Sequence, residues 1–149
     1  MSVQPLPQPS VDALQDALAT EHAALWCYSL AVAFLADGQR DQARADAAEH
    51  LRMRSAVERT LSRFGTRAQS AQPAYATPEP VVDAASAARL LVVAETDAMA
   101  AWRSVLERSP VAGVRRPALQ ALTDGTLRCA RWRVVVGQPP AIPIFPGRP

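Results

Sequence analysis

The stretch from Leu14 to Leu35 places an acid in the middle of an apolar helical face. Apolar or aromatic side chains recur there at steps of four and three residues, the spacing of one face of a helix in a bundle: Leu14, Leu18, Leu25, Tyr28, Val32 and Leu35. Glu21 fills the remaining position of this series. A carboxylate directed at a core must be neutralised, paired or bound to a metal, because a buried lone charge is costly. The partner of Glu21 therefore decides what this chain can do.

The same periodicity recurs in two later segments, and a fourth segment is rich in apolar residues, so the sequence predicts an all-α four-helix bundle. Alanine, the best helix former, dominates outside the Pro-rich stretches. The predicted helices cover residues 11–36, 39–64, 83–108 and 114–136. Ser10 and Asp83 are the expected N-caps of the first and third helices. Asp37-Gly38 is the expected break between the first two.

The predicted bundle, residues 10–137, has an extended segment at each end. Residues 1–9 are expected to form an N-terminal arm, and the Pro-rich tail 138–149 to lie extended on the bundle or on a second subunit. Residues 65–82 contain three prolines and cannot be helical throughout. Stretched out at ~3.3 Å per residue, this segment spans about 55 Å, more than the ~39 Å length of a helix of about 26 residues. We therefore expect a long crossover between the second and third helices, the topology of ferritin-like bundles.

Two of the other predicted helices also carry a polar residue at the centre of their inward series. In the second helix His50 is central, within Ala43, Ala47, His50, Arg54, Val57, Leu61 and Phe64. In the third helix Glu95 is central, within Ala84, Ala88, Leu91, Glu95, Ala98, Trp102 and Val105. Three nitrogen and oxygen donors of this kind can hold one iron, manganese or zinc ion with open positions. Glu49 and Asp124 would be auxiliary ligands of such a site.

The usual two-metal pattern of these bundles is incomplete in this chain. That pattern takes a Glu from each of two helices and a Glu-x-x-His from each of the other two. Ala47 stands three residues before His50, and Leu127 stands three residues after Asp124, so neither Glu-x-x-His motif is intact. The alternative is that the core acids pair with an inward arginine such as Arg54, Arg128 or Arg131. A buried ion pair of this kind would be the relic of a lost site, because removing one partner strands the other charge.

Charge and cysteine usage exclude several classes of function. The net charge is only +2, every basic residue is an arginine, and no basic run of the kind that binds nucleic acid is present. No apolar run is long enough to span a membrane, and the first ten residues lack the pattern of a signal peptide. Cys27 and Cys129 are far apart and are expected to be buried thiols. We therefore expect a soluble cytoplasmic protein with neither nucleic acid nor membrane as a partner.

Several short motifs follow one another in a characteristic order. They are Glu21-His22-Ala23-Ala24, His50 with Arg52 and Arg54, Asp83-Ala-Ala-Ser-Ala-Ala-Arg89-Leu90, Ala121-Leu-Thr-Asp124, Arg131-Trp132-Arg133 and Phe145-Pro146-Gly147. In this order and spacing the chain resembles the actinobacterial ferritin-like domain family of unknown function. The resemblance covers nearly the whole chain and implies a four-helix ferritin-like fold without a known activity. The wider relatives of that family bind two metals.

Three hypotheses for function follow. The first is a non-enzymatic bundle that acts through self-association, as a homodimer, or through a protein partner. The second is a reduced metal site of Glu21, His50 and Glu95 for oxidative or storage chemistry, which as an enzyme would be a metal-dependent oxidoreductase. The third is a small-molecule-binding bundle in which the acids form the polar end of an apolar pocket.

Overall fold

The structure is a computed structural model that describes residues 4–148. It has four α-helices and, among the described residues, no strand: α1 (Gln8–Val32), α2 (Asp37–Arg63), α3 (Ala84–Arg108) and α4 (Ala112–Val135). The predicted all-α four-helix architecture is confirmed. Positions 1–3 of the predicted arm and position 149 of the predicted tail lie outside the described residues.

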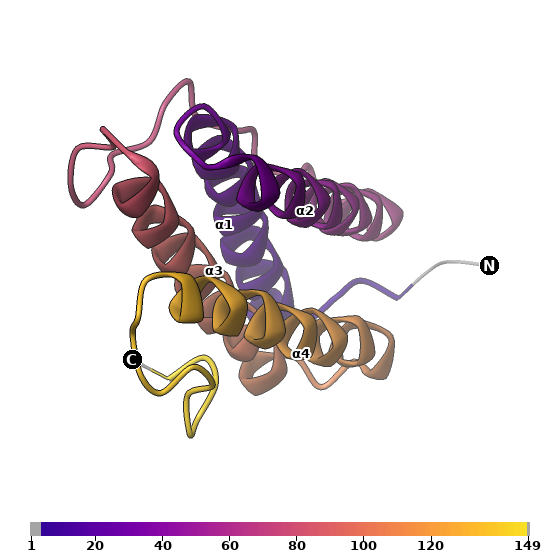
Figure 1. Cartoon of the computed structure of the whole chain (residues 1–149). Coiled ribbons are helices and arrows are strands. Elements are labelled where there is room, and N and C mark those ends of the chain that lie inside the picture. Colours follow the sequence, from indigo (N-terminus) through magenta and orange to yellow (C-terminus); the bar gives the residue numbers. More distant parts are fainter. Residues whose placement is uncertain (1–3, 149) are drawn as a thin grey trace.

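The helices pack around α1 and α3. α1 packs against α2 and α3, and α3 packs against α4 (Figure 1). Two apolar clusters fill the two ends of the bundle. One includes Leu14, Leu18, Val57, Leu61, Trp102, Val105 and Ala118, and the other includes Leu35, Ala43, Leu91, Cys129 and Trp132. On α1, α2 and α4 a polar residue lies between the positions that belong to the two clusters, and on α3 Glu95 lies one turn before Met99 of the second cluster, so a polar layer crosses the middle of the bundle.

The predicted helix bounds are off by one to four residues at most ends, and the largest differences lie at the two ends of α1. α1 begins at Gln8, before Ser10, because Pro7 supplies a suitable backbone angle at the N-cap position. Ser10 is therefore no cap: it is buried and donates a hydrogen bond to Ser109 Oγ at 2.9 Å. Asp37 belongs to the first turn of α2, where a negative charge suits the helix dipole, so the break falls earlier, at residues 33–36. Asp83 does cap α3, accepting a hydrogen bond from Ser86 N at 2.7 Å.

The segment between α2 and α3 runs alongside α1. Gln15 near the start of α1 donates to Arg67 O at 2.8 Å. Further along α1, the Trp26 ring lies 5.9 Å from the Tyr75 ring, measured between centroids. These two contacts place the segment beside α1 from Gln15 to Trp26, and Figure 1 shows its last part looping out before the start of α3.

The C-terminal segment folds back onto α3. Arg103 Nη1 donates to Pro146 O at 3.4 Å. Gly147 has a φ of 80°, and a Cβ there would lie 2.8 Å from both Met99 O and Arg103 Cβ. Only glycine fits this position, because both the backbone angle and the close approach exclude a side chain. Among the described residues, no helix has the length and apolar character that a membrane span requires.

Candidate functional site

Each of the four helices contributes one charged side chain to the polar layer at the middle of the bundle. Glu21 comes from α1, His50 from α2, Glu95 from α3 and Arg128 from α4. The first three side chains are fully buried, and Arg128 is 6 % exposed. The structure thus brings together the three residues that the sequence singled out, Glu21, His50 and Glu95.

His50 bridges the two buried acids. Its Nδ1 lies 2.6 Å from Glu21 Oε2, and its Nε2 lies 2.8 Å from Glu95 Oε1. An ionised carboxylate only accepts hydrogen bonds, so both ring nitrogens donate and the ring is an imidazolium. Burial alone would lower the pKa of His50, but the hydrogen bonds and charges of the two glutamates outweigh burial and raise it to about 9.

The two glutamates differ in their remaining partners. Glu21 Oε1 accepts a hydrogen bond from Trp102 Nε1 at 2.7 Å. Glu95 Oε1 accepts from Tyr28 Oη at 2.6 Å and from Arg128 Nε at 3.0 Å, in addition to His50. Burial would raise the pKa of Glu95, but His50, Arg128 and the Tyr28 hydroxyl together lower it. Glu95 therefore remains ionised in a fully buried position.

A second shell of hydrogen bonds centres on Asp46, one helical turn before His50. Asp46 is buried, and its Oδ1 accepts from Arg131 Nη2 at 2.8 Å. Its Oδ2 accepts from Trp132 Nε1 at 3.0 Å, and that indole nitrogen also lies 3.1 Å from Tyr28 Oη. The Tyr28 hydroxyl thus joins the two shells. Burial, followed by the charges of Glu95 and Asp46, raises the pKa of Tyr28 well above its usual range, so the phenol keeps its proton.

The charges of the network balance. Glu21 and Glu95 carry two negative charges, and His50 and Arg128 carry two positive ones. Asp46 pairs with Arg131 in the second shell. A network in which every charge has a partner avoids the penalty for a lone buried ion. Each charge therefore depends on the others for its place in the core.

The other residues named from the sequence lie elsewhere. Glu49 pairs with Arg52 on an exposed face of α2, and half-buried Asp124 accepts from Gln120 at 2.9 Å, so neither reaches the network. Arg54 is not a partner of the core acids, because its guanidinium turns toward Glu58, 3.9 Å away. Of the arginines considered, Arg128 meets Glu95, while Glu21 pairs with His50 rather than with an arginine.

Sequence reasoning missed three contributors to the network. Asp46 lies four residues before His50, on the same helical face, and this spacing was the available signal. The sequence assigns Trp102 and Trp132 no polar role, yet each donates its indole N–H to a buried acid. A buried tryptophan usually finds an acceptor, so a core acid one or two turns away is the pattern to look for.

The donor set does not fit a resident metal in this arrangement. Both nitrogens of His50 already face carboxylates, and the Arg128 guanidinium occupies the position of a cation beside Glu95. A ligating histidine needs one deprotonated ring nitrogen directed at the metal. Within residues 4–148, no group of three or more His, Cys, Asp and Glu side chains is arranged to hold a metal ion.

Four helices in this order, with acids at the centres of the first and third, define a ferritin-like four-helix bundle. The family model described as "Domain of unknown function (DUF4439)" matches residues 13–149, and the chain belongs to that family. This match confirms the resemblance to a family of unknown function, and the ferritin-like part of that resemblance is shown for the fold by the second structure described below.

Two solved structures show the same fold. A conserved hypothetical protein from Mycobacterium tuberculosis is 36% identical, with a TM-score of 0.83 over 86% of this chain and 97% of that one. A ferritin-like, diiron-carboxylate protein from Bacillus anthracis has a TM-score of 0.77 at 10% identity, over 87% of this chain and 96% of that one. The second likeness shows the fold alone. A comparison with curated proteins finds no match.

Proposed function

We propose that this chain is a non-enzymatic ferritin-like bundle whose central acids are held by its own cations, and that it acts through self-association. The observation that carries the first part is the position of His50 between Glu21 and Glu95. With Arg128, this imidazolium supplies the positive charge that paired acids in a bundle core require. In this proposal the buried network stabilises the fold, and residues on the surface carry out the function.

An apolar stripe on the outer face of α4 supports self-association. Leu119, Leu127 and Val134 follow one another at intervals of eight and seven residues, the spacing of one helical face, and they are 55%, 52% and 68% exposed. We call these three residues the α4 stripe. Scattered exposed apolar residues are ordinary, whereas apolar residues aligned on one helical face favour an interaction surface. A homodimer would cover the stripe on both copies at once, because a two-fold axis brings the same surface patch together.

The charges beside the α4 stripe are opposite in sign; within one chain Arg131 uses one Nη on Asp46 while its side chain stays 45% exposed, and Asp124 accepts from Gln120. Asp124 and Arg131 are seven residues apart, so they lie along the same edge of the stripe, on either side of Leu127. In an antiparallel pair of α4 helices with the two-fold axis near Leu127, Asp124 of each copy comes level with Arg131 of the other. In the same arrangement Leu119 faces Val134 of the second copy. This register favours a second copy of the chain over an unrelated partner.

Measurement of the oligomeric state tests the proposal. Sedimentation velocity over a range of concentrations should give a dimer that Leu127→Glu converts to a monomer with an unchanged helical spectrum. Leu51→Glu is the matched control, because Leu51 is 45% exposed on α2 and lies outside the stripe. We expect this control to remain dimeric. A monomeric wild-type chain at every concentration would overturn the self-association, and equal effects of the two variants would overturn the α4 stripe as its surface.

A metal-binding protein for oxidative or storage chemistry is the alternative. One observation favours it: Glu95 Oε2 is buried and accepts no hydrogen bond from the described residues, so this oxygen is free to coordinate a metal ion. Metal analysis of protein purified after growth with iron, manganese or zinc decides between the two. Stoichiometric metal that is lost in the Glu21→Gln/Glu95→Gln double variant would support the alternative. Metal-free protein whose melting temperature these ions do not change supports the ionic network.

A further inference from the structure

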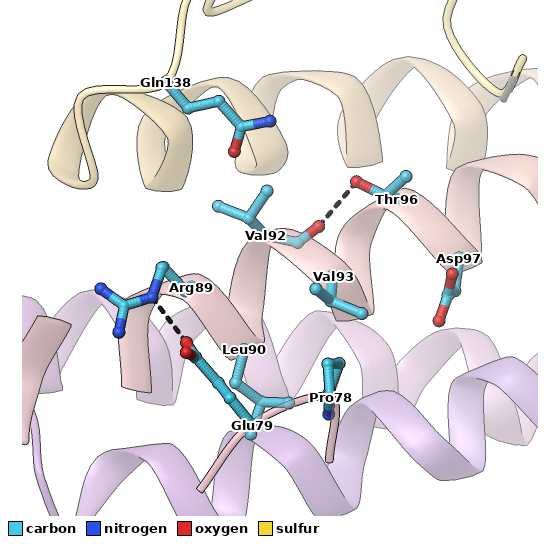
Figure 2. Close-up of a pocket in the computed structure, with 9 residues that line it drawn as sticks. All are labelled: Pro78, Glu79, Arg89, Leu90, Val92, Val93, Thr96, Asp97 and Gln138. Atoms are coloured by element: carbon cyan, nitrogen blue, oxygen red, sulfur yellow. Dashed lines mark hydrogen bonds and ion pairs between the residues drawn. The ribbon is translucent and has the colours of Figure 1, made fainter. Parts of the chain in front are cut away.

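A groove lies on the face of α3 that points away from the buried network. Two cavities, of about 550 and 430 Å³, adjoin there. They share Pro78, Leu90, Val93 and Asp97, so they form one continuous hollow, which we call the α3 groove. Figure 2 shows the larger part, with Asp97 at one end and the Glu79–Arg89 ion pair at the other.

Small side chains of α1 and α3 make the floor of the smaller part. Ala23, Ala24 and Ala94 leave room that larger residues would fill, and Leu90 and Val93 add apolar wall. Residues 75–78 of the segment between α2 and α3 form the opposite rim. That rim is held in place, since Tyr75 contacts Trp26 and the Glu79 carboxylate accepts from Arg89 Nε at 2.5 Å. The shape of the hollow is therefore fixed by contacts within the folded chain.

Asp97 carries the only charge of the smaller part. No basic side chain lines it, and the Asp97 carboxylate forms no hydrogen bond or ion pair with residues 4–148. The Asp97 side chain lies at the exposed edge of the hollow, and the burial of part of it raises the pKa of its carboxyl group. Burial and the charge of Asp97 raise the pKa of the nearby Cys27 thiol to about 11, so that thiol stays neutral. The Thr20 hydroxyl is already used, because it donates to Ala17 O at 2.8 Å.

We propose that the smaller part of the α3 groove binds a small organic amine, with the ammonium group on Asp97 and the apolar body on the alanine floor. The volume lies in the range of small-molecule sites, and such sites combine apolar walls with a few placed polar groups. A cationic ligand gains binding free energy here because it can pair with a carboxylate that has no partner among the described residues. An anion would be repelled by the same carboxylate, and a neutral ligand would gain only the apolar contact.

Three indole ligands of similar size test this proposal: tryptamine with a positive side-chain group, tryptophol with a neutral one and indole-3-acetate with a negative one. Titration calorimetry should show tryptamine binding at least about tenfold more tightly than tryptophol, the effect of one charge-assisted hydrogen bond. Indole-3-acetate should bind more weakly than both. In amide-resolved NMR spectra tryptamine should shift the signals of residues 23–27, 75–78 and 90–97. Equal binding of all three ligands, or shifts elsewhere on the chain, would overturn the proposal.

Two variants distinguish the effect of the Asp97 charge on ligand binding from the effect of the shape of the hollow. Asp97→Asn should reduce tryptamine affinity by about tenfold, to that of tryptophol, and leave tryptophol binding unchanged. Asp41→Asn, the same change at an exposed carboxylate paired with Arg44, is the control and should alter neither. Ala23→Phe should block both ligands, because the half-buried Ala23 lines the hollow. Unchanged tryptamine binding by Asp97→Asn would show that the carboxylate is not the recognition group.

Discussion

Glu95 and Asp97 lie two residues apart on α3 and have opposite surroundings. Glu95 faces the bundle interior, where His50, Arg128 and Tyr28 all donate to one of its oxygens. Asp97 faces outward beside the α3 groove, and none of the described side chains pairs with it. Burial opposes ionisation at both sites. The partners of Glu95 outweigh this effect and lower its pKa, whereas nothing does so at Asp97 and its pKa rises.

The difference separates two uses of a carboxylate. A carboxylate that is paired with cations and hydrogen-bond donors of its own chain stabilises the fold, so its substitution changes the free energy of unfolding. A carboxylate that has no such partner and lies beside an apolar hollow contributes little to the stability of the fold and is free to bind a ligand. Large stability effects should therefore follow changes in the buried network, and small ones should follow changes in the α3 groove.

The largest expected effect comes from the imidazole between the two buried acids. His50→Ala leaves Glu21 and Glu95 facing each other without their bridging cation, and should lower the free energy of unfolding by about 3–5 kcal/mol. Urea denaturation measures this loss. The control is His22→Ala, which removes a buried imidazole whose Nε2 lies 3.0 Å from Gln69 O and which bridges no acids. It should cost about 1 kcal/mol. Similar losses in the two variants would argue against the network as the central source of stability.

The raised pKa of His50 makes the free energy of unfolding depend on pH. The folded protein holds this proton up to a pH of about 9, whereas the unfolded chain releases it near 6.5. Between these values the native state binds one more proton, so the free energy of unfolding should fall by about 3 kcal/mol as the pH rises. Below 6.5 the contribution is fully present. The lowered pKa of Glu95 acts in the opposite sense and removes stability on acidification.

Denaturation at a series of pH values between 6.5 and 9 checks this slope. In His50→Gln the group that titrates in this range is gone, so the unfolding free energy should change little with pH there. A wild-type chain whose stability is flat across the same range would show that the buried imidazole is neutral in the native state.

A smaller loss is expected where one hydroxyl joins the two shells of the network. Tyr28→Phe removes the donor to Glu95 and one acceptor of Trp132 Nε1, and should cost about 1–2 kcal/mol. Tyr75→Phe is the control, because the Tyr75 hydroxyl accepts from Gln72 N on the half-exposed segment between α2 and α3. It should cost less than about 0.5 kcal/mol. Thermal unfolding of the two variants side by side would separate the buried from the exposed hydroxyl.

The smallest effect is expected on the other face of α3. Asp97→Asn removes a charge that has no internal partner, so stability should stay within about 0.5 kcal/mol of the wild type. Unfolding in urea measures this as well. A loss as large as that of Tyr28→Phe would mean that Asp97 belongs to the fold, and the contrast between the two faces of α3 would fail.

Much of the fold follows from helical spacing. The steps of four and three residues place Glu21, His50 and Glu95 inside correctly, because each is flanked by apolar residues on both sides. The capping of α3 by Asp83 was also readable, since the partner Ser86 stands three residues later. Ser10 has the same local signature as a cap, but a distant serine, Ser109, takes its hydroxyl. Local sequence contains no information about that contact.

The network itself was only partly predictable. On α2 the inward residue between Ala43 and His50 is Asp46 rather than Ala47, and Arg54 turns away. Steps of three and four residues are both compatible with one helical face, so the pattern alone does not choose between such neighbours. The inward direction of Arg128 depends in the same way on the rotation of α4, which packing fixes. Spacing therefore identified Glu21, His50 and Glu95 as buried, but it missed the third buried acid, Asp46, and did not choose among the candidate arginine partners.

The polar layer between the two apolar clusters has a consequence for how the helices align. An alanine-rich helix offers nearly the same surface after sliding by one turn, about 5.4 Å. In this bundle such a slip would remove one charge from its counter-charge and set it against hydrocarbon. The four charged side chains can therefore pair with one another in only one axial alignment of the helices. We infer that replacing all four charges with apolar residues would leave a helical protein that had lost its unique register.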